Sequence, residues 1–102
     1  MDIVIDGSTL VLSGDFDARS TWEVRAALYE LLEGRDDDVV VDLTDVRLVD
    51  VTALKVLAVA TRQAGRNGHH LTLRGCNGGV RRLLHMTRLF RLVEVERVAV
   101  SA

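Results

Sequence analysis

The 102-residue chain contains no proline, one cysteine and only four Phe, Trp or Tyr residues. The single cysteine, Cys76, excludes an internal disulfide framework and favours a cytoplasmic location. No apolar run approaches the roughly 20 residues of a membrane-spanning helix, so we expect no membrane insertion. The first residues, Met1–Ile3, lack the basic start and the apolar stretch of a signal peptide.

Familiar catalytic patterns are missing as well. There is no Gly-rich phosphate loop with a lysine and no G-x-S-x-G motif. His69 and His70 are adjacent and point to opposite sides of a strand, which favours a solvated strand start over a metal site. Nothing in the sequence brings Cys76 to His85, so a loop or half-buried thiol is favoured and a redox role is the lesser alternative. We therefore predict a protein that is not an enzyme and needs no metal or cofactor.

Charge is divided unevenly along the chain. Residues 1–50 carry 4 Arg and 13 Asp or Glu, a formal charge of −9, whereas residues 51–102 carry 9 Lys or Arg and 2 Glu, giving +7. In a small interleaved fold the two halves mix, so a bipolar surface is the less favoured interpretation. The basic residues are not interleaved with aromatic ones, which argues against a nucleic-acid partner.

Apolar periodicity predicts eight elements in the order β-β-α-β-α-β-α-β. The expected strands are Asp2–Asp6, Thr9–Ser13, Val39–Leu43, Leu71–Arg74 and Val93–Val100, and the expected helices are Ala18–Glu33, a segment from Asp50–Thr52 to about Arg66, and Val80–Thr87. We expect loops at Gly14–Asp17 and Gly75–Gly79 and a polar turn before Leu48. This order indicates one α/β domain over residues 1–102, with a mixed sheet of about five strands and three or more helices.

The entrance to the second helix is the first place to look for function. Asp17 and Asp50 each follow a strand, so the sheet places both on the same rim. Each is a candidate helix N-cap, although the first helix also offers a capping box from Ser20 to Glu23. On that helix, Trp22 and Tyr29 either cover an edge of the fold or mark a partner surface.

The run D-L-T-D-V-R-L-V-D-V-T-A-L-K-V-L, residues 42–57, resembles the STAS family of anti-sigma factor antagonists and anion-transporter domains. The family pattern there is D-L-S-x-V-x-x-(I/M/V)-D-S-S-G-L-x-V-L. Gly14–Asp17 resembles the family's G-x-(L/I/F)-D, and Val80–Phe90 resembles its V-R-R-x-L-x-x-(T/S)-G-L-x segment. The resemblance spans essentially the whole chain and implies the STAS fold.

The resemblance also implies partner switching. In this family the unmodified antagonist binds an anti-sigma factor, usually one with a histidine-kinase-like ATPase fold, and so frees a sigma factor. The anti-sigma factor phosphorylates the first serine of D-S-S-G, and the modified antagonist is released. A phosphate adds about −1.5 to −2 charge inside a packed interface, which accounts for the release.

This chain departs from the family pattern at the phosphoacceptor. Val51 occupies that position and has no hydroxyl, Ala53 and Arg88 replace glycines, and Lys55 stands where a small residue is common. Thr52 is an alternative acceptor, but a first-turn helix contact is its favoured role. We therefore expect an atypical antagonist that works without phosphorylation.

The expected partner surface consists of Asp17, Asp50, Val51, Thr52, Lys55, Cys76, Asn77, Gly78 and Gly79. One alternative is a STAS subunit or scaffold of a larger assembly, such as a lipid-transport or stress-signalling complex. Another is a small-ligand sensor that binds an anion at the helix start. The oligomeric state stays open between a monomer and a weak dimer.

Overall fold

The computed structural model describes residues 1–34 and 36–96. Within them the strands are β1 (Asp2–Asp6), β2 (Thr9–Phe16), β3 (Val39–Val49), β4 (Leu71–Arg74) and β5 (Glu94–Val95). The helices are α1 (Thr21–Gly34), α2 (Val51–Arg66), α3 (Gly78–Thr87) and a short 3-10 helix, η1 (Leu89–Arg91). The predicted α/β class and the predicted order of elements are confirmed.

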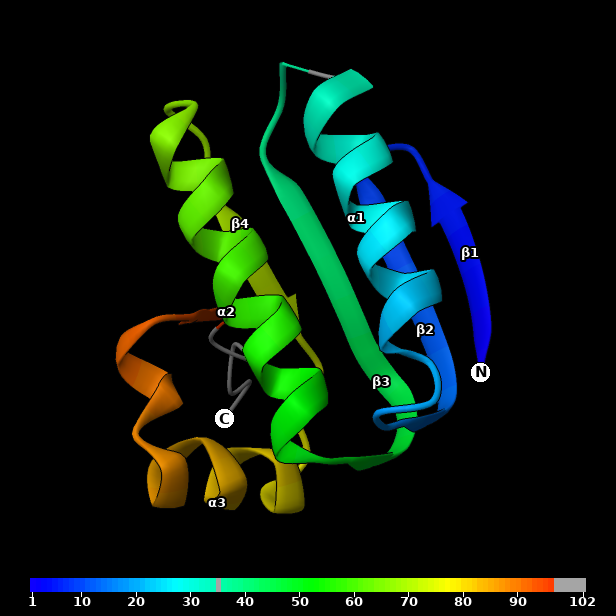
Figure 1. Cartoon of the computed structure of the whole chain (residues 1–102), viewed down its shortest axis with the longest axis vertical. Coiled ribbons are helices and arrows are strands. Elements are labelled where there is room, and N and C mark those ends of the chain that lie inside the picture. The colour runs from blue at the N-terminus through cyan, green and yellow to red at the C-terminus, as the bar shows by residue number, and fades with distance from the viewer. Residues whose placement is uncertain (35, 97–102) are drawn as a thin grey trace, which may run out of the picture.

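The sheet has the spatial order β1-β2-β3-β4-β5, with β1 antiparallel to β2 and every other neighbouring pair parallel. Figure 1 shows α1 and α2 side by side over one face of the sheet, and α3 across the edge where β3 ends. Because parallel strands end at a common edge, the β2–α1 and β3–α2 connections lie next to each other there.

The core lies between the sheet and the two helices α1 and α2. Alternate strand positions and one stripe of each helix supply its apolar side chains. Its fully buried members include Leu10, Leu12, Phe16, Val41, Leu71 and Leu73 from the strands and Val24, Leu28, Leu54 and Leu57 from the helices. Burying one such side chain stabilises a fold by about 1.5–3 kcal/mol, so this layer holds the helices on the sheet.

Strand β3 is longer than the sequence predicted. The expected strand stopped at Leu43, with a polar turn before Leu48, but β3 runs without a break to Val49. Its pairing with β2 shifts register twice, and the buried residues Leu43, Val46 and Val49 follow at intervals of three instead of two. Such bulges keep the backbone paired while they break the alternation of side chains. The predicted turn was wrong because it rested on the polar residues that follow the apolar run Val39–Leu43, and these residues remain paired within β3.

Strand β2 also extends further than expected. The segment Gly14–Asp17 was predicted as a loop, but β2 continues through Phe16, whose side chain is fully buried. The reason is that the long β3 offers a pairing partner up to this point. Helix α1 begins at Thr21, three residues after the predicted Ala18.

Helix α3 begins two residues before the predicted Val80. Gly78 and Gly79 form its first turn, although both were expected in a loop. Asn77 is the N-cap, and its Oδ1 accepts the backbone N–H of Val80 at 2.9 Å. An Asn cap stabilises a helix start by about as much as a glycine in it costs, so the cap offsets the poor helix propensity of the glycines.

The last strand is shorter than predicted within the described residues. The expected strand covered Val93–Val100, and β5 comprises Glu94–Val95, with Val95 paired to Leu73 of β4. Residues 97–100 of that prediction lie outside the described part of the chain.

Candidate functional site

Asp50 lies between β3 and α2 and caps the helix. Its backbone is extended, with φ −100° and ψ 174°, and its Oδ1 accepts the N–H of Ala53 at 2.8 Å. The N–H of Asp50 donates to the carbonyl of Phe16 at 3.2 Å, which continues the pairing of β3 with β2. The predicted cap at Asp50 is confirmed, and it fixes the residue at which α2 begins.

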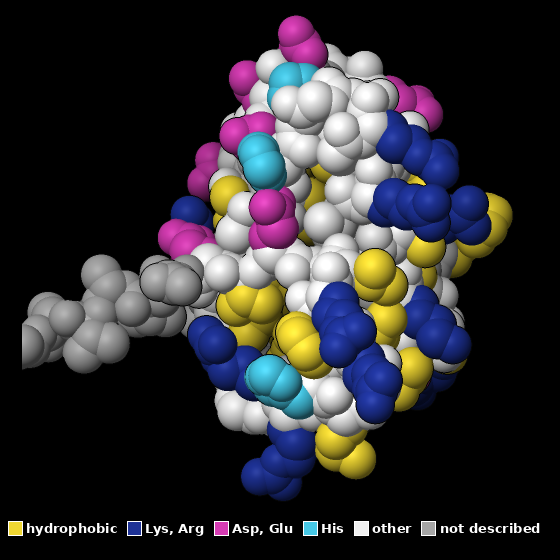
Figure 2. All heavy atoms as spheres, turned by 90° about the vertical axis from the view of Figure 1, so that its left-hand side faces the viewer, with side chains coloured by type: hydrophobic (Ala, Val, Ile, Leu, Met, Phe, Trp, Pro, Cys, Tyr) yellow, Lys and Arg dark blue, Asp and Glu magenta, His cyan; other side chains and the backbone are white. Residues whose placement is uncertain are grey.

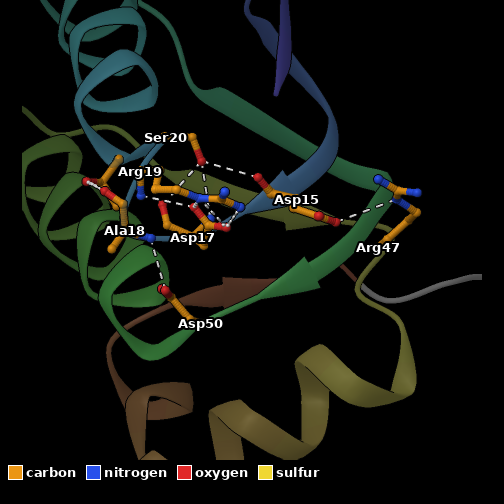
Figure 3. Close-up of polar contacts among 8 residues, drawn as sticks. Asp15, Asp17, Ala18, Arg19, Ser20, Arg47 and Asp50 are labelled. Atoms are coloured by element: carbon orange, nitrogen blue, oxygen red, sulfur yellow. Dashed lines mark hydrogen bonds and ion pairs between the residues drawn. The ribbon is translucent and has the colours of Figure 1, made fainter.

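The second carboxylate oxygen of Asp50 reaches the neighbouring connection. Its Oδ2 accepts the N–H of Ala18 at 3.0 Å, as Figure 3 shows. Phe16 is the register partner of Val49, so β2 and β3 end side by side. The structure thus brings Asp17 and Asp50 to one edge of the sheet, as the strand order led us to expect. One side chain ties the β2–α1 connection to the start of α2.

The Asp17 carboxylate is held within its own loop by Arg19. The Arg19 guanidinium lies 2.7 Å from Oδ2, and the Arg19 backbone N–H donates to Oδ1 at 3.0 Å. These hydrogen bonds, the side-chain ones first, lower the pKa of Asp17. Asp17 is therefore anionic at neutral pH, and the adjacent guanidinium offsets part of its charge (Figure 3).

Neither capping scheme predicted for α1 is observed. The Asp17 carbonyl accepts the N–H of Ser20 at 3.0 Å, which forms a turn before the helix starts at Thr21. The buried Ser20 hydroxyl contacts the preceding loop: it accepts the Asp17 N–H at 3.2 Å and donates to the carbonyl of Asp15. Ser20 therefore orders the loop that carries Asp17 instead of forming a capping box with Glu23. Aspartate and serine in this spacing favour such turns, a signal that the sequence analysis did not use.

The first turn of α2 presents side chains outward. Val51, at the usual phosphoacceptor position, is 36% exposed, and Thr52 and Lys55 are also exposed. No acidic residue lies in this first turn. The helix start therefore combines an aliphatic group, a hydroxyl and a cation beside the two carboxylates of the rim.

A groove of about 340 Å³ continues this surface between α1 and α2. Thr52 and Lys55 line it from α2, and Arg25 and Tyr29 line it from α1. The Arg25 guanidinium lies 5.5 Å from the centroid of the Tyr29 ring. Trp22 is 77% exposed, so it does not cover an edge of the fold. Arg25 was missed because the packing of the two helices, not the local sequence, places it on the same groove as Lys55.

The segment before α3 divides into a buried and an exposed part. Cys76 is only 8% exposed, and burial raises the pKa of its thiol. Its expected place on the contact surface is therefore wrong, and the raised pKa disfavours a reactive thiolate. Asn77, Gly78 and Gly79 are exposed. Asn77 and Gly79 line a groove of about 240 Å³ together with Val49 at the end of β3.

Residues 1–34 and 36–96 contain neither a metal-binding cluster nor a membrane-spanning helix. No group of three or more His, Cys, Asp or Glu side chains there is placed to hold a metal ion. None of the helices in the same residues combines the length and the apolar character needed to cross a bilayer.

Several solved structures share this fold. A Thermotoga maritima protein proposed to be an anti-sigma factor antagonist matches with a TM-score of 0.79 and 19% identity, over 96% of this chain and 86% of its own. An anti-sigma factor antagonist from Mycobacterium paratuberculosis matches with a TM-score of 0.76 and 19% identity, over 95% and 84%. A sulfate transporter family protein from Wolinella succinogenes matches with a TM-score of 0.68 and 16% identity, over 90% and 79%.

Sequence comparison identifies the family. No curated protein sequence matches this chain. The model of the family described as "Mlab, STAS domain" matches residues 2–94, which is nearly the whole chain. The predicted resemblance is therefore confirmed at the level of the family, and the chain belongs to the STAS domain family.

Proposed function

We propose that this STAS domain is an anti-sigma factor antagonist, which binds an anti-sigma factor stoichiometrically and so releases a sigma factor. Family membership supports this role, as does the fold shared with solved antagonists. The main observation in support is that the start of α2 is exposed and that both carboxylate oxygens of Asp50 hold it in one geometry. A preordered surface loses little conformational entropy on binding.

The proposed contact surface is centred on that helix start. Its members come from the β2–α1 connection, the first two turns of α2 and the start of α3, and they are Asp17, Asp50, Val51, Thr52, Lys55, Asn77, Gly78 and Gly79. The aliphatic side chain of Val51 supplies apolar contact. The neighbouring carboxylates and Lys55 supply charges that fix orientation and favour the correct partner.

Control by phosphate is absent from the proposed mechanism. Val51 lacks the oxygen that would accept a phosphoryl group. An anti-sigma factor with a kinase-like ATPase fold would bind this surface but would find no hydroxyl at position 51 to phosphorylate. It therefore lacks the usual step that releases the antagonist. Regulation then falls on the amounts of the two proteins.

A charge introduced at Val51 tests the proposed surface. We expect Val51→Asp to weaken binding to an anti-sigma factor encoded in the same genome by at least about tenfold, because it adds a desolvated charge beside Asp50 and Asp17. Thr52→Glu is expected to act in the same direction. Asn67→Asp, which adds the same charge at the other end of α2, should leave the affinity within about twofold. Isothermal titration calorimetry measures all four proteins, and equal affinities would remove this surface from the proposal.

A second candidate function is a STAS subunit of a larger assembly. The similarity to a sulfate transporter family protein supports it, because the same fold occurs in a protein of that class. The two functions predict different proteins that copurify with the native protein. Native purification of an antagonist should yield an anti-sigma factor, whereas an assembly subunit should elute with stable components of a transporter or scaffold.

A further inference from the structure

A third groove lies between α2 and η1, about two helical turns from the start of α2. It has a volume of about 370 Å³. Its walls are formed by Ala58, Val59, Thr61 and Arg62 of α2 and by Arg91 and Leu92 at the end of η1. Val59 is seven residues beyond Thr52, which corresponds to roughly 10 Å along the helix. Val59 also lines the groove between α1 and α2, so the two grooves adjoin at this residue. None of the residues of the proposed antagonist surface lines the α2–η1 groove.

Large apolar side chains are exposed on both walls of the α2–η1 groove. Val59 is 57% exposed and Leu92 is 58% exposed, and Phe90, the neighbour of Arg91, is 41% exposed. Single exposed apolar residues are ordinary, but a cluster on facing elements around a concavity marks an interaction site. Figure 2 shows these types of side chain together, with apolar groups between Lys and Arg over the lower half of that face.

The charge around the α2–η1 groove has one sign. Of the residues that the structure describes, Arg62 and Arg91 line it and no acidic residue does. The sequence from Gly78 to Val93 contains four arginines and neither Asp nor Glu. Among the described residues, the ion pairs involve neither Arg62 nor Arg91. The Arg91 guanidinium lies 5.9 Å from the centroid of the Phe90 ring, a contact that leaves its N–H groups at the edge of the guanidinium plane free to bind a carboxylate.

We propose that the α2–η1 groove is a docking site for an acidic amphipathic helix of a partner protein. The apolar side chains of such a helix would pack against Val59 and Leu92, and its carboxylates would bind the guanidinium groups of Arg62 and Arg91 in bidentate pairs. The concave shape favours a helix over a lipid surface, since a groove between two walls receives inserted side chains. The proposal does not depend on the antagonist function.

A synthetic probe tests this proposal directly. The probe is a fluorescein-labelled helix of about four turns with Leu on one face and Glu on the other. Fluorescence anisotropy should show saturable binding in the micromolar range, about tenfold tighter than that of the same helix with Lys in place of Glu. NMR shifts caused by the probe should centre on Val59, Thr61 and Leu92. Shifts centred elsewhere, or no binding at millimolar probe, would overturn the proposal.

Charge reversal with a matched control locates the site. The double variant Arg62→Glu, Arg91→Glu should bind the acidic probe at least about tenfold more weakly. The control is the double variant Arg66→Glu, Arg82→Glu, which changes the net charge by the same amount at exposed residues outside the α2–η1 groove. Its affinity for the probe should fall by less than about threefold. Circular dichroism checks that both variants fold. Equal losses in the two variants would indicate attraction by net charge alone and would contradict the proposal.

Two further outcomes separate this site from others. Val51→Asp should leave probe binding unchanged, so failure of the antagonist surface and failure of this groove are distinguishable. Vesicles of phosphatidylglycerol and phosphatidylcholine should bind more weakly than the probe. Tight vesicle binding that depends on Arg62 and Arg91, without probe binding, would replace the proposed protein partner with an anionic lipid surface.

Discussion

Helices α2 and α3 begin in nearly the same way, but the second hydrogen bond made by each cap residue differs in partner and in length. Both follow an extended residue whose side chain accepts the third backbone N–H: Asp50 from Ala53 at 2.8 Å and Asn77 from Val80 at 2.9 Å. Asp50 has a second anionic oxygen, which binds the β2–α1 loop. Asn77 also makes a second bond, from its Nδ2 to the carbonyl of Val46 in β3, but this bond is longer, at 3.4 Å. The bond from the Ala18 N–H to the Asp50 carboxylate is 3.0 Å long and charge-assisted, so the tie at the rim of α2 is the stronger one.

The residues after the two caps differ as well. Val51 and Thr52 of α2 carry side chains that a partner can recognise, but Gly78 and Gly79 of α3 offer mainly backbone. We infer that the start of α2 supplies specificity at the shared edge of the sheet. The start of α3 supplies space for a partner to approach.

The largest loss of stability is expected for a substitution at Gly75, in the segment that leads into α3. Gly75 has φ 74°, and a Cβ there would overlap Oγ1 of Thr44 and lie 2.9 Å from the Thr44 Cα. We expect Gly75→Ala to lower the free energy of unfolding by about 3 kcal/mol, since the backbone of β3 cannot move aside cheaply. Gly68→Ala is the matched control, because Gly68 has φ 78° and open space around it, and it should cost about 1 kcal/mol. Urea unfolding measures the free energy of unfolding of both variants. Equal losses would show that contact with Thr44 adds nothing to the cost of a left-handed backbone at Gly75.

The two caps should differ in their contribution to stability. Asn77→Ala removes one capping hydrogen bond and the long bond to the Val46 carbonyl, and it should cost about 1 kcal/mol. Asp50→Ala removes a cap and the tie to the Ala18 N–H, and it should cost about 2 kcal/mol. Urea unfolding of both variants provides the comparison. A loss at Asp50 no greater than that at Asn77 would contradict the view that the tie stabilises the rim.

At the ends of the two helices, a substitution is expected to raise stability in α3 but not in α2. Arg88 ends α3 in the left-handed region with φ 61°, whereas Asn67 ends α2 with φ −92°. Only glycine adopts the left-handed region without steric cost, so Arg88→Gly should raise the free energy of unfolding by about 1 kcal/mol. Asn67→Gly should give no gain. Thermal and urea unfolding of the two variants test this, and a gain at both positions would exclude relief of strain as the cause.

The smallest effect is expected for the ion pair of the rim. Arg19 lowers the pKa of Asp17 below its ordinary value of 3.8. A depressed carboxyl pKa stabilises the folded state above about pH 4, and that contribution is lost as the pH falls through the folded value. Asp17→Asn should therefore be slightly less stable than the natural protein at pH 7 and equally stable at the acid end. A difference that persists unchanged in acid would mean that Asp17 acts through hydrogen bonds alone.

The fold could be predicted from sequence to the extent that it depends on local periodicity. The order of elements and the cap at Asp50 follow from apolar spacing and from residue types near one another in the chain. The length of β3 could not be predicted, because bulges against β2 alter which of its residues face the core. The burial of Cys76 and the placement of Arg25 and Lys55 on one groove arise only when separate elements pack together.

The central claim is that the start of α2 binds a partner without control by phosphate. The most direct test incubates the protein with ATP and a kinase-fold anti-sigma factor that it binds, followed by intact mass and affinity measurement. The account predicts that the natural protein stays unmodified and bound, whereas Val51→Ser gains one phosphoryl group and is released. A phosphoryl group on Thr52 of the natural protein, accompanied by release of the partner, would contradict it.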